Sequence, residues 1–406
     1  PGGGTMTPRL YLPDMAVASC LGMGKAATVA PLFAGEGGRV RPRHGVLPGS
    51  AAPLGALATE PAPLVGAMAG WDSRNNRLLA ALATEIADPI ERLKRRHGAD
   101  RIAVVVGTST SGIAEGDAAL AERRRHGVWP SGFHYRQQET GGGALLLARL
   151  LGLSGPAYAV ATACSSAAKA LASARRLIRA GLADAAIAGG ADTLCRLTVA
   201  GFASLEALSP APCNPFSANR RGIAIGEGGA LFILAPEPAE VELAGIGESS
   251  DAHHPSAPDP SGDGALAAMA AALADACLAP AAIGYVNLHG TATLLNDAME
   301  ARAMARLFAA AQPPASSTKA LTGHALGAAG ALEAAILWLT LSRCWNPLGQ
   351  VPPHRWDGVA DPALPPLNLA DAGTRLPDGQ ATALSNSFAF GGSNCCLALR
   401  RDGEAP

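Results

Sequence analysis

The chain has 406 residues, of which 49% are hydrophobic and 16% charged, and its formal net charge is −1. A chain of this length can bury a large core and allows two or three compact units. The balanced charge excludes a global field that would gather nucleic acid, although a local basic patch could still dock an acidic partner. No apolar run of about 18 residues lacks a charge, so we expect no membrane span.

The eight cysteines form no Cys-x-x-Cys pair, and the histidines near them do not complete a zinc spacing. We therefore expect no metal site and mostly buried, reduced thiols, which are typical of a cytoplasmic protein. No signal peptide opens the chain, and residues 1–5, ahead of Met6, are interpreted as a tag remnant.

Strand-like and helix-like stretches alternate along the first half, which predicts layered α/β structure. Asp72 and Ser73 are good N-cap residues for a helix over 74–96. A second helix is expected from Cys164 to Gly181, where small and apolar residues recur at helical spacing. Continuous apolar runs predict buried strands over residues 101–107, 157–161, 184–190 and 228–234.

The second half repeats this order with a strand over 283–288, helices over 297–308 and 326–342, and two final strands over 381–385 and 394–400. Val106-Gly-Thr-Ser-Thr resembles Leu288-His-Gly-Thr-Ala-Thr, and the segment after Cys164 resembles the segment after His324. Because both pairs occur in the same order, we predict two duplicated halves, 6–240 and 241–406, packed into one body.

Cys164 is the first candidate for chemistry because it lies where a buried strand changes into a helix. The unpaired N–H groups and the positive dipole end of a helix favour a thiolate. The small neighbours in Ala161-Thr-Ala-Cys-Ser-Ser leave room for a thioester. A buried structural cysteine is the alternative interpretation of this segment alone.

Two histidines strengthen the catalytic interpretation, because His289 and His324 both stand in glycine-bounded turns at strand-to-helix changes. Ligand sites of α/β sheets form at such positions. A neutral imidazole there can donate its N–H to a thioester oxygen that becomes an enolate. One histidine alone would more often be a core residue, but two beside a candidate nucleophile favour a site.

An ordered set of motifs between about Asp72 and Arg400 resembles the β-ketoacyl-(acyl carrier protein) synthases, the thiolase-fold condensing enzymes of fatty acid and polyketide synthesis. The motifs are Ala161-Thr-Ala-Cys-Ser-Ser, Ala188-Gly-Gly-Ala-Asp, Ile225-Gly-Glu-Gly-Gly, Gly284-Tyr-Val-Asn-Leu-His-Gly-Thr, Ser317-Thr-Lys-Ala-Leu-Thr-Gly-His and Ser385-Asn-Ser-Phe-Ala-Phe-Gly-Gly-Ser-Asn. The resemblance implies a five-layer αβαβα fold built from two thiolase-like halves.

The resemblance also implies roles. Cys164 would accept an acyl group from the phosphopantetheine arm of an acyl carrier protein, with no bound cofactor. His289 and His324 would hold the malonyl carbonyl and stabilise the enolate formed on loss of CO₂. The backbone N–H groups of Cys164 and Phe390 would form the oxyanion hole. A buried pair of Lys319 and Glu300 would order the histidines.

Other positions match the family around the substrate path. Phe390 matches a gating aromatic, and Phe202 matches a residue that lines the acyl pocket, although core packing explains an apolar ring about as well. Arg74 and Arg77 match a carrier-docking helix, and a second basic cluster contains Arg124 and Arg125. A solvated helix face is an equally good interpretation of these arginines.

Three departures from the family pattern indicate a divergent branch. Two acids are lost in Pro215-Phe-Ser-Ala-Asn-Arg-Arg-Gly, the segment Thr293-Leu-Leu-Asn-Asp lacks the usual proline and glycine, and Ala389 replaces glycine before Phe390. The segment Pro215-Phe-Ser-Ala-Asn-Arg, the short span between Cys164 and His289, and the tail Val351-Pro-Pro-His-Arg-Trp-Asp most resemble the ketosynthases of bacterial aryl polyene synthesis. That branch implies a heterodimer with a chain-length factor, and a homodimer is the alternative.

Three other functions remain to be weighed. A housekeeping fatty acid ketosynthase fits the same catalytic residues. A thiolase would need a second catalytic cysteine near the C-terminus, but Cys395 and Cys396 fall on an expected strand. A non-catalytic chain-length-factor partner should lack the nucleophile, which this chain keeps.

Overall fold

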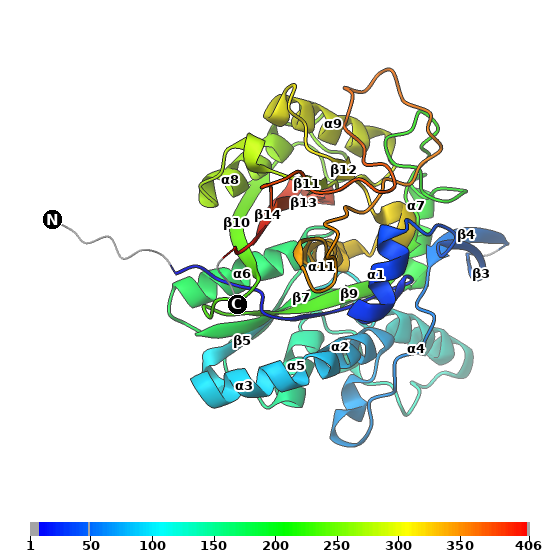
Figure 1. Ribbon diagram of the computed structural model, residues 1–406. Helices are drawn as coiled ribbons and strands as arrows, with labels where there is room; N and C mark the ends of the chain where they lie inside the picture. Colours follow the sequence, from blue (N-terminus) through cyan, green and yellow to red (C-terminus); the bar gives the residue numbers. More distant parts are fainter. Residues whose placement is uncertain (1–7, 48, 404–406) are drawn as a thin grey trace.

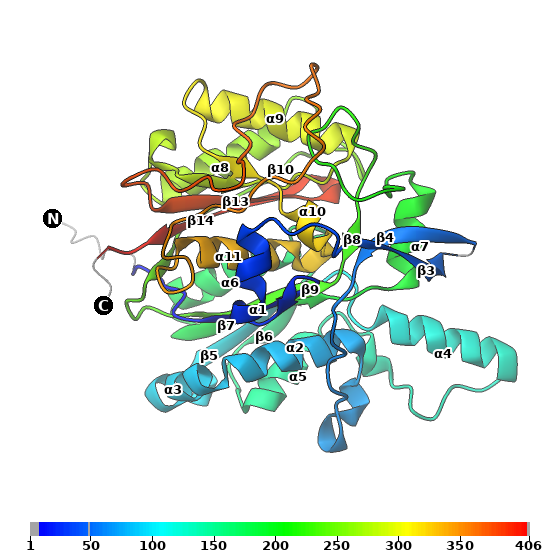
Figure 2. The same ribbon diagram turned by 45° about the vertical axis from the view of Figure 1, so that its right-hand side comes forward.

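The molecule consists of five layers in the order helix, sheet, helix, sheet, helix (Figures 1 and 2). A computed structural model describes residues 8–47 and 49–403, so the interpretation of residues 1–5 and the start at Met6 lie outside the described residues. The predicted five-layer thiolase-like architecture is confirmed, since helices α6 (Ser166–Arg179) and α11 (Ala329–Leu341) lie between the two large sheets.

Each half of the chain supplies one large sheet. The six-stranded sheet has the order β2-β1-β9-β7-β5-β6, with β2 at Gly22–Met23, β1 at Met15–Ser19, β9 at Gly228–Leu234, β7 at Ala185–Asp192, β5 at Ile102–Gly107 and β6 at Ala157–Val160. The five-stranded sheet has the order β10-β14-β13-β11-β12, with β10 at Val241–Ser250, β14 at Ser393–Arg401, β13 at Thr382–Phe388, β11 at Tyr285–Asn287 and β12 at Ala315–Ser316. The predicted boundary between the halves falls between β9 and β10.

Helices cover the outer faces and a small sheet lies at one end. The outer face of the first sheet is covered by α2 (Arg74–Glu85), α3 (Ala87–His97) and α5 (Gly142–Leu151), and that of the second by α8 (Asp263–Asp275) and α9 (Leu294–Phe308). The remaining helices are α1 (Lys25–Phe33), α4 (Ile113–His126), α7 (Arg196–Ser204) and α10 (Lys319–Thr322). The small sheet contains β3 (Arg41–Leu47), β4 (Ser50–Gly55) and β8 (Ile225–Gly226).

Several predicted boundaries moved for local reasons. The helix expected over 74–96 is broken at Ile86, and Pro89 lies in the first turn of the new helix α3, where its missing N–H costs nothing. Helix α6 begins at Ser166, so Cys164 precedes the helix instead of opening it. Helix α9 begins at Leu294, three residues before the predicted start.

The middle layer is apolar because it is covered on both sides. All 13 residues of α11 are buried, including Leu332 and the single charge, Glu333. Leu171 of α6, Phe232 of β9 and Leu397 of β14 belong to the same core cluster. Such a layer needs small residues where α6 and α11 approach each other. A Cβ atom on Gly330 would lie only 2.7 Å from the Cβ of Ala168.

We expect Gly330→Ala to lower the free energy of unfolding by about 1–3 kcal/mol, because the added methyl must push α11 away from α6. Urea denaturation measures this change. Gly201→Ala is the matched control: Gly201 lies in helix α7 with open space around its Cβ, so the substitution should stabilise by up to about 1 kcal/mol. Equal effects at both positions would contradict the close packing of the middle layer.

Candidate active site

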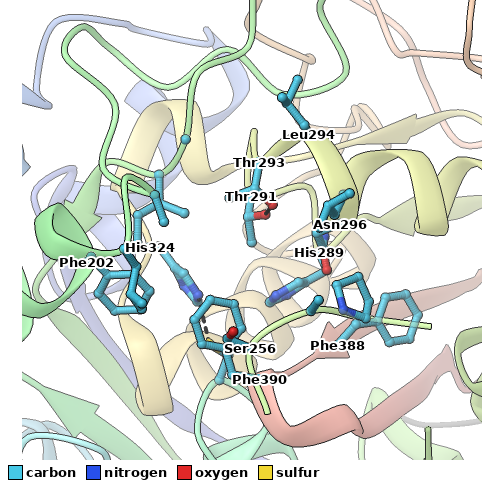
Figure 3. Close-up of a pocket in the computed structure, with 18 of the residues that line it drawn as sticks. Phe202, Ser256, His289, Thr291, Thr293, Leu294, Asn296, His324, Phe388 and Phe390 are labelled. Carbon is cyan, nitrogen blue, oxygen red and sulfur yellow. Dashed lines mark hydrogen bonds between the residues drawn. The ribbon is translucent and has the colours of Figure 1, made fainter. Parts of the chain in front are cut away.

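A cavity of about 420 Å³ lies where residues of the two halves meet. The buried residues Cys164, His289 and His324 line its inner end, while exposed side chains such as Leu294 line its entrance. Figure 3 shows the rings of His289 and His324 pointing into the same space, with Phe390 beside them. The structure thus brings together the three residues that the sequence singled out in separate segments.

The turn before α6 presents the Cys164 thiol to the cavity. Ala163 has a left-handed backbone conformation (φ 51°), which bends the chain sharply after β6. The Ser166 hydroxyl holds this turn, since it accepts a hydrogen bond from the Thr162 N–H at 2.8 Å and donates one to the Ala163 carbonyl at 2.6 Å. The position of the thiol is therefore fixed by backbone rather than by side-chain rotamers.

The Cys164 sulfur lies 3.1 Å from Nε2 of His324. Burial raises the pKa of the Cys164 thiol to about 11, while the charge of Lys319 and the N–H of Phe390, which points at the sulfur, act in the opposite direction. The resting group at neutral pH is therefore a thiol. Burial opposes the thiolate that the expected helix start would favour, and α6 begins only at Ser166, two residues after Cys164.

Both histidines are neutral. Burial is the largest cause that lowers the pKa of His289 and of His324, and the charge of Lys319 lowers both further. The His324 backbone is pinned to β8, because its N–H donates to the Ala224 carbonyl at 2.7 Å and its carbonyl accepts from the Gly226 N–H at 3.0 Å. The two rings stand edge to face, with centroids 5.4 Å apart.

Lys319 sets the proton position on His289. Its ammonium group donates to the His289 carbonyl and lies 3.4 Å from His289 Nδ1. Since an ammonium group only donates, Nδ1 is the acceptor and Nε2 carries the ring proton. A neutral N–H donor is thereby fixed at the inner end of the cavity.

The acidic partner of Lys319 is Glu333, and the expected pair of Lys319 with Glu300 is wrong. Glu333 accepts a short hydrogen bond from the Lys319 ammonium group, and both side chains are almost fully buried. Glu300 instead accepts from the N–H groups of His289 and Gly290, at 2.8 and 2.7 Å, and from the Asn386 amide at 3.0 Å. It shapes the His289 turn through the backbone. The sequence did carry a signal, since Glu333 is the single charge of an apolar helix.

Two aromatic rings close one side of the cavity. Phe202 and Phe390 both line it, and their ring centroids lie 5.7 Å apart. Phe390 stands in a turn in which Gly391 (φ 78°) and Gly392 (φ 72°) take the left-handed conformation that glycine permits. The predicted gating and acyl-pocket roles remain predictions that this placement favours.

The predicted docking arginines differ in how free their charges are. Arg74 forms a two-point ion pair with the buried Glu227, and Arg77 binds Asp72 at 2.6 Å. Both also lie beside Glu60. Arg124 and Arg125 are exposed on α4, and Arg125 forms an ion pair with Glu122 of the same helix at 3.0 Å. A carrier-docking role remains a prediction for all four, but internal carboxylates already offset the charges of the first two.

The sequence did not predict the hydrogen bonds between two of its unusual segments, 215–220 and 351–361. His354 accepts the Ser317 N–H at Nδ1 (3.1 Å), and its Nε2 donates to the Pro215 carbonyl (3.0 Å). Asp357 accepts from Ser217 Oγ and Asn219 Nδ2, each at 2.8 Å. The segment 351–361 therefore holds the segment 215–220 beside the cavity, and no local pattern announced this long-range contact.

The cysteine and the two histidines also offer three ligand atoms within 4.8 Å of one another, a spacing compatible with a metal ion. The ammonium group of Lys319 lies 3.4 Å from His289 Nδ1 and opposes a cation at this place. The arrangement fits acid–base and nucleophilic chemistry better, because a nucleophile, a base and a fixed N–H donor converge.

Comparison with known proteins places this site in a family. Residues 76–239 match the family model described as "Beta-ketoacyl synthase, N-terminal domain", and residues 241–349 match "Beta-ketoacyl synthase, C-terminal domain". The chain belongs to the β-ketoacyl synthase family, whose members are acyltransferases. The predicted family is confirmed.

Two solved structures are similar to this chain over nearly its whole length. A structure described as a ketosynthase (ApeO) in complex with its chain length factor (ApeC), from Xenorhabdus doucetiae, is 42% identical over 99% of this chain and 100% of that chain, with a TM-score of 0.92. A β-ketoacyl synthase from Burkholderia phymatum is 29% identical over 97% of this chain and 100% of that chain, with a TM-score of 0.85.

Matches to curated relatives are shorter. Nodulation protein E of Rhizobium leguminosarum bv. trifolii is 39% identical over 62% of this chain, and the match spans 63% of that protein. The mitochondrial 3-oxoacyl-[acyl-carrier-protein] synthase of Arabidopsis thaliana is 38% identical over 61% of this chain, and the match spans 56% of that protein. Among the described residues, no helix combines the length and the hydropathy needed to cross a membrane.

The corrected ion pair can be tested by thermodynamic coupling. We expect Glu333→Gln to lower the free energy of unfolding by about 3–5 kcal/mol, because it leaves the Lys319 charge buried without its partner. Combining it with Lys319→Met should recover much of that loss in denaturant titrations. The same cycle with Glu300→Gln is the control and should show little coupling. If Lys319 couples more strongly to Glu300 than to Glu333, the pair expected from the sequence, Lys319 with Glu300, is correct.

Proposed function

We propose that the chain catalyses decarboxylative condensation of an acyl group held on Cys164 with malonyl-acyl carrier protein, which gives a 3-oxoacyl chain two carbons longer. The observation that carries the proposal is the convergence at one inner cavity wall of the Cys164 thiol, His324 Nε2 at 3.1 Å and the N–H donor of His289. The similarity to a ketosynthase over 99% of the chain supports it.

The first half-reaction transfers the acyl group. His324 Nε2 takes the thiol proton as the Cys164 sulfur attacks the acyl thioester of the carrier, which removes the barrier set by the high pKa of the thiol. The carrier thiolate leaves and takes this proton from His324. In this step the N–H of Phe390, which contacts the sulfur in the resting site, and the N–H of Cys164 donate to the developing oxyanion. The thioester on Cys164 is then buried among Phe202 and Phe390.

The second half-reaction forms the new carbon–carbon bond. The malonyl thioester oxygen accepts the His289 Nε2–H. Because no hydrogen-bond partner fixes the tautomer at His324 Nδ1, the His324 ring proton moves from Nδ1 to Nε2 once Cys164 is acylated, and Nε2–H donates to the same oxygen, so that loss of CO₂ leaves a stabilised enolate. The enolate carbon attacks the Cys164 thioester. The Cys164 thiolate leaves and regains a proton from solvent, and the 3-oxoacyl chain remains on the carrier.

We infer further that the chain acts in aryl polyene synthesis as a heterodimer with a chain-length factor. The support is the set of unusual segments at 215–220, 293–297 and 351–361, together with the similarity to a ketosynthase whose structure is described in complex with its chain length factor. A homodimer and a housekeeping fatty acid role are the alternatives. Free thiols at all eight cysteines fit a cytoplasmic location.

The two half-reactions can be separated by substitution. On incubation with acyl-loaded carrier protein, intact-mass measurement should show one acyl group on the wild type and none on Cys164→Ala. His289→Ala should still be acylated, but its condensation rate with malonyl-carrier should fall about 10²–10³-fold, because one donor to the enolate is lost. Equal acylation of wild type and Cys164→Ala would refute the nucleophile. A His289→Ala variant that condenses normally would refute the enolate-stabilising role.

A further inference from the structure

The entrance of the cavity is lined by exposed apolar side chains. Leu205, Leu294 and Leu295 have exposed fractions of 57, 60 and 60%, and all three line the same cavity whose inner end holds Cys164. Single exposed leucines are ordinary on protein surfaces, but three around one opening make a local apolar patch. We call these leucines, together with Glu206 and Arg221, the entrance rim.

Arg221 is the free positive charge of the entrance rim. It is exposed and lines the cavity, and none of the carboxylates in the described residues lies within ion-pair distance of it. The preceding residue, Arg220, also lines the cavity, but it is buried and paired with Asp361 at 2.6 Å. Arg221 also occupies the position where the family pattern has one of the two acids that this chain lacks. At this position the chain therefore carries a positive charge where the family pattern carries a negative one.

Glu206 contributes the opposing charge of the rim. It is exposed and lines the same cavity, yet it is not within ion-pair distance of Arg221. Its backbone is left-handed (φ 54°), so the position of the carboxylate follows from the turn after α7. The rim therefore combines an exposed cation and an exposed anion, not paired with each other, with three exposed leucines that line the same cavity.

The rim leads directly to the reacting groups. In Figure 3, Leu294 lies farthest from the two histidines, and Thr293 and Thr291 lie between it and His289. All of these residues line one cavity. The same cavity thus connects the rim to the inner end where Cys164, His289 and His324 lie.

We propose that the entrance rim is the docking surface for the malonyl-loaded carrier protein, with Arg221 binding the phosphodiester of the phosphopantetheine arm and the three leucines contacting the carrier itself. This inference rests on the proposed function. A phosphodiester is an anion with oxygen acceptors that suit a guanidinium group. The leucines gain by burial against an apolar face of the carrier. The rim thereby takes the docking role expected of Arg74 and Arg77, whose charges are offset internally.

Three malonyl donors can test the phosphodiester contact of Arg221 and the carrier contact of the leucines separately. Malonyl-N-acetylcysteamine lacks both phosphate and carrier, malonyl-coenzyme A has phosphate without carrier, and malonyl-carrier protein has both. For Arg221→Gln, kcat/KM with malonyl-coenzyme A relative to malonyl-N-acetylcysteamine should fall about tenfold. Glu206→Gln should move this ratio in the opposite direction, because it removes a negative charge from the same rim.

Leu294→Ser combined with Leu295→Ser should raise KM for malonyl-carrier about tenfold while leaving the ratio between the two small donors at its wild-type value. Matched controls are Arg95→Gln, an exposed arginine on α3, and Leu348→Ser, a leucine 56% exposed outside the rim. Neither should change any ratio.

The outcomes distinguish this inference from the proposed function. If Arg221→Gln and Arg95→Gln give the same donor ratios, Arg221 does not bind the phosphodiester. If the leucine variant keeps the wild-type KM for malonyl-carrier, the leucines do not dock the carrier. In both cases the proposed condensation stands, since the wild type still turns over its donors. If the wild type condenses none of the three donors, the proposed function itself is wrong.

Discussion

The buried charge of Lys319 is the constraint on which the rest of the site depends. Its ammonium group touches the His289 ring and carbonyl and pairs with Glu333 of the central helix α11. A buried ammonium group is tolerated only when it is paired and fully hydrogen-bonded. This one does three things at once. It orients His289, adds to the effect of burial in lowering the pKa of both imidazoles, and ties the catalytic turn to the middle layer.

The second constraint is that the nucleophile and the histidines come from different halves of the chain. Cys164 precedes α6 in the first half, while His324 precedes α11 in the second. Their contact at 3.1 Å therefore depends on how closely α6 and α11 pack, and Gly330 against Ala168 sets that approach. The packing between the two halves therefore determines the distance between Cys164 and His324.

The sequence predicted the features that depend on neighbouring residues alone, namely the buried strands and the turns that carry the catalytic residues. Apolar runs located the central strands, the change from strand to helix located Cys164, and the glycine-bounded turns located His289 and His324. The sequence could not assign the partner of Lys319, because Glu300 and Glu333 are both buried acids and only the packing of α11 distinguishes them. It also overestimated the thiolate character of Cys164, since burial is a property of the whole fold. The contact of Asp357 with Ser217 spans 140 residues and has no local signature.

The central claim is that Lys319 and burial keep both imidazoles neutral, with the proton of His289 on Nε2. Nitrogen-15 NMR of histidine-labelled protein, assigned with His289→Gln and His324→Gln, measures this directly between pH 5 and 8. We predict that both rings stay neutral throughout and that His289 shows a protonated Nε2 and an unprotonated Nδ1. Conversion of either ring to imidazolium with a midpoint near 6.5, the ordinary histidine value, would contradict the account.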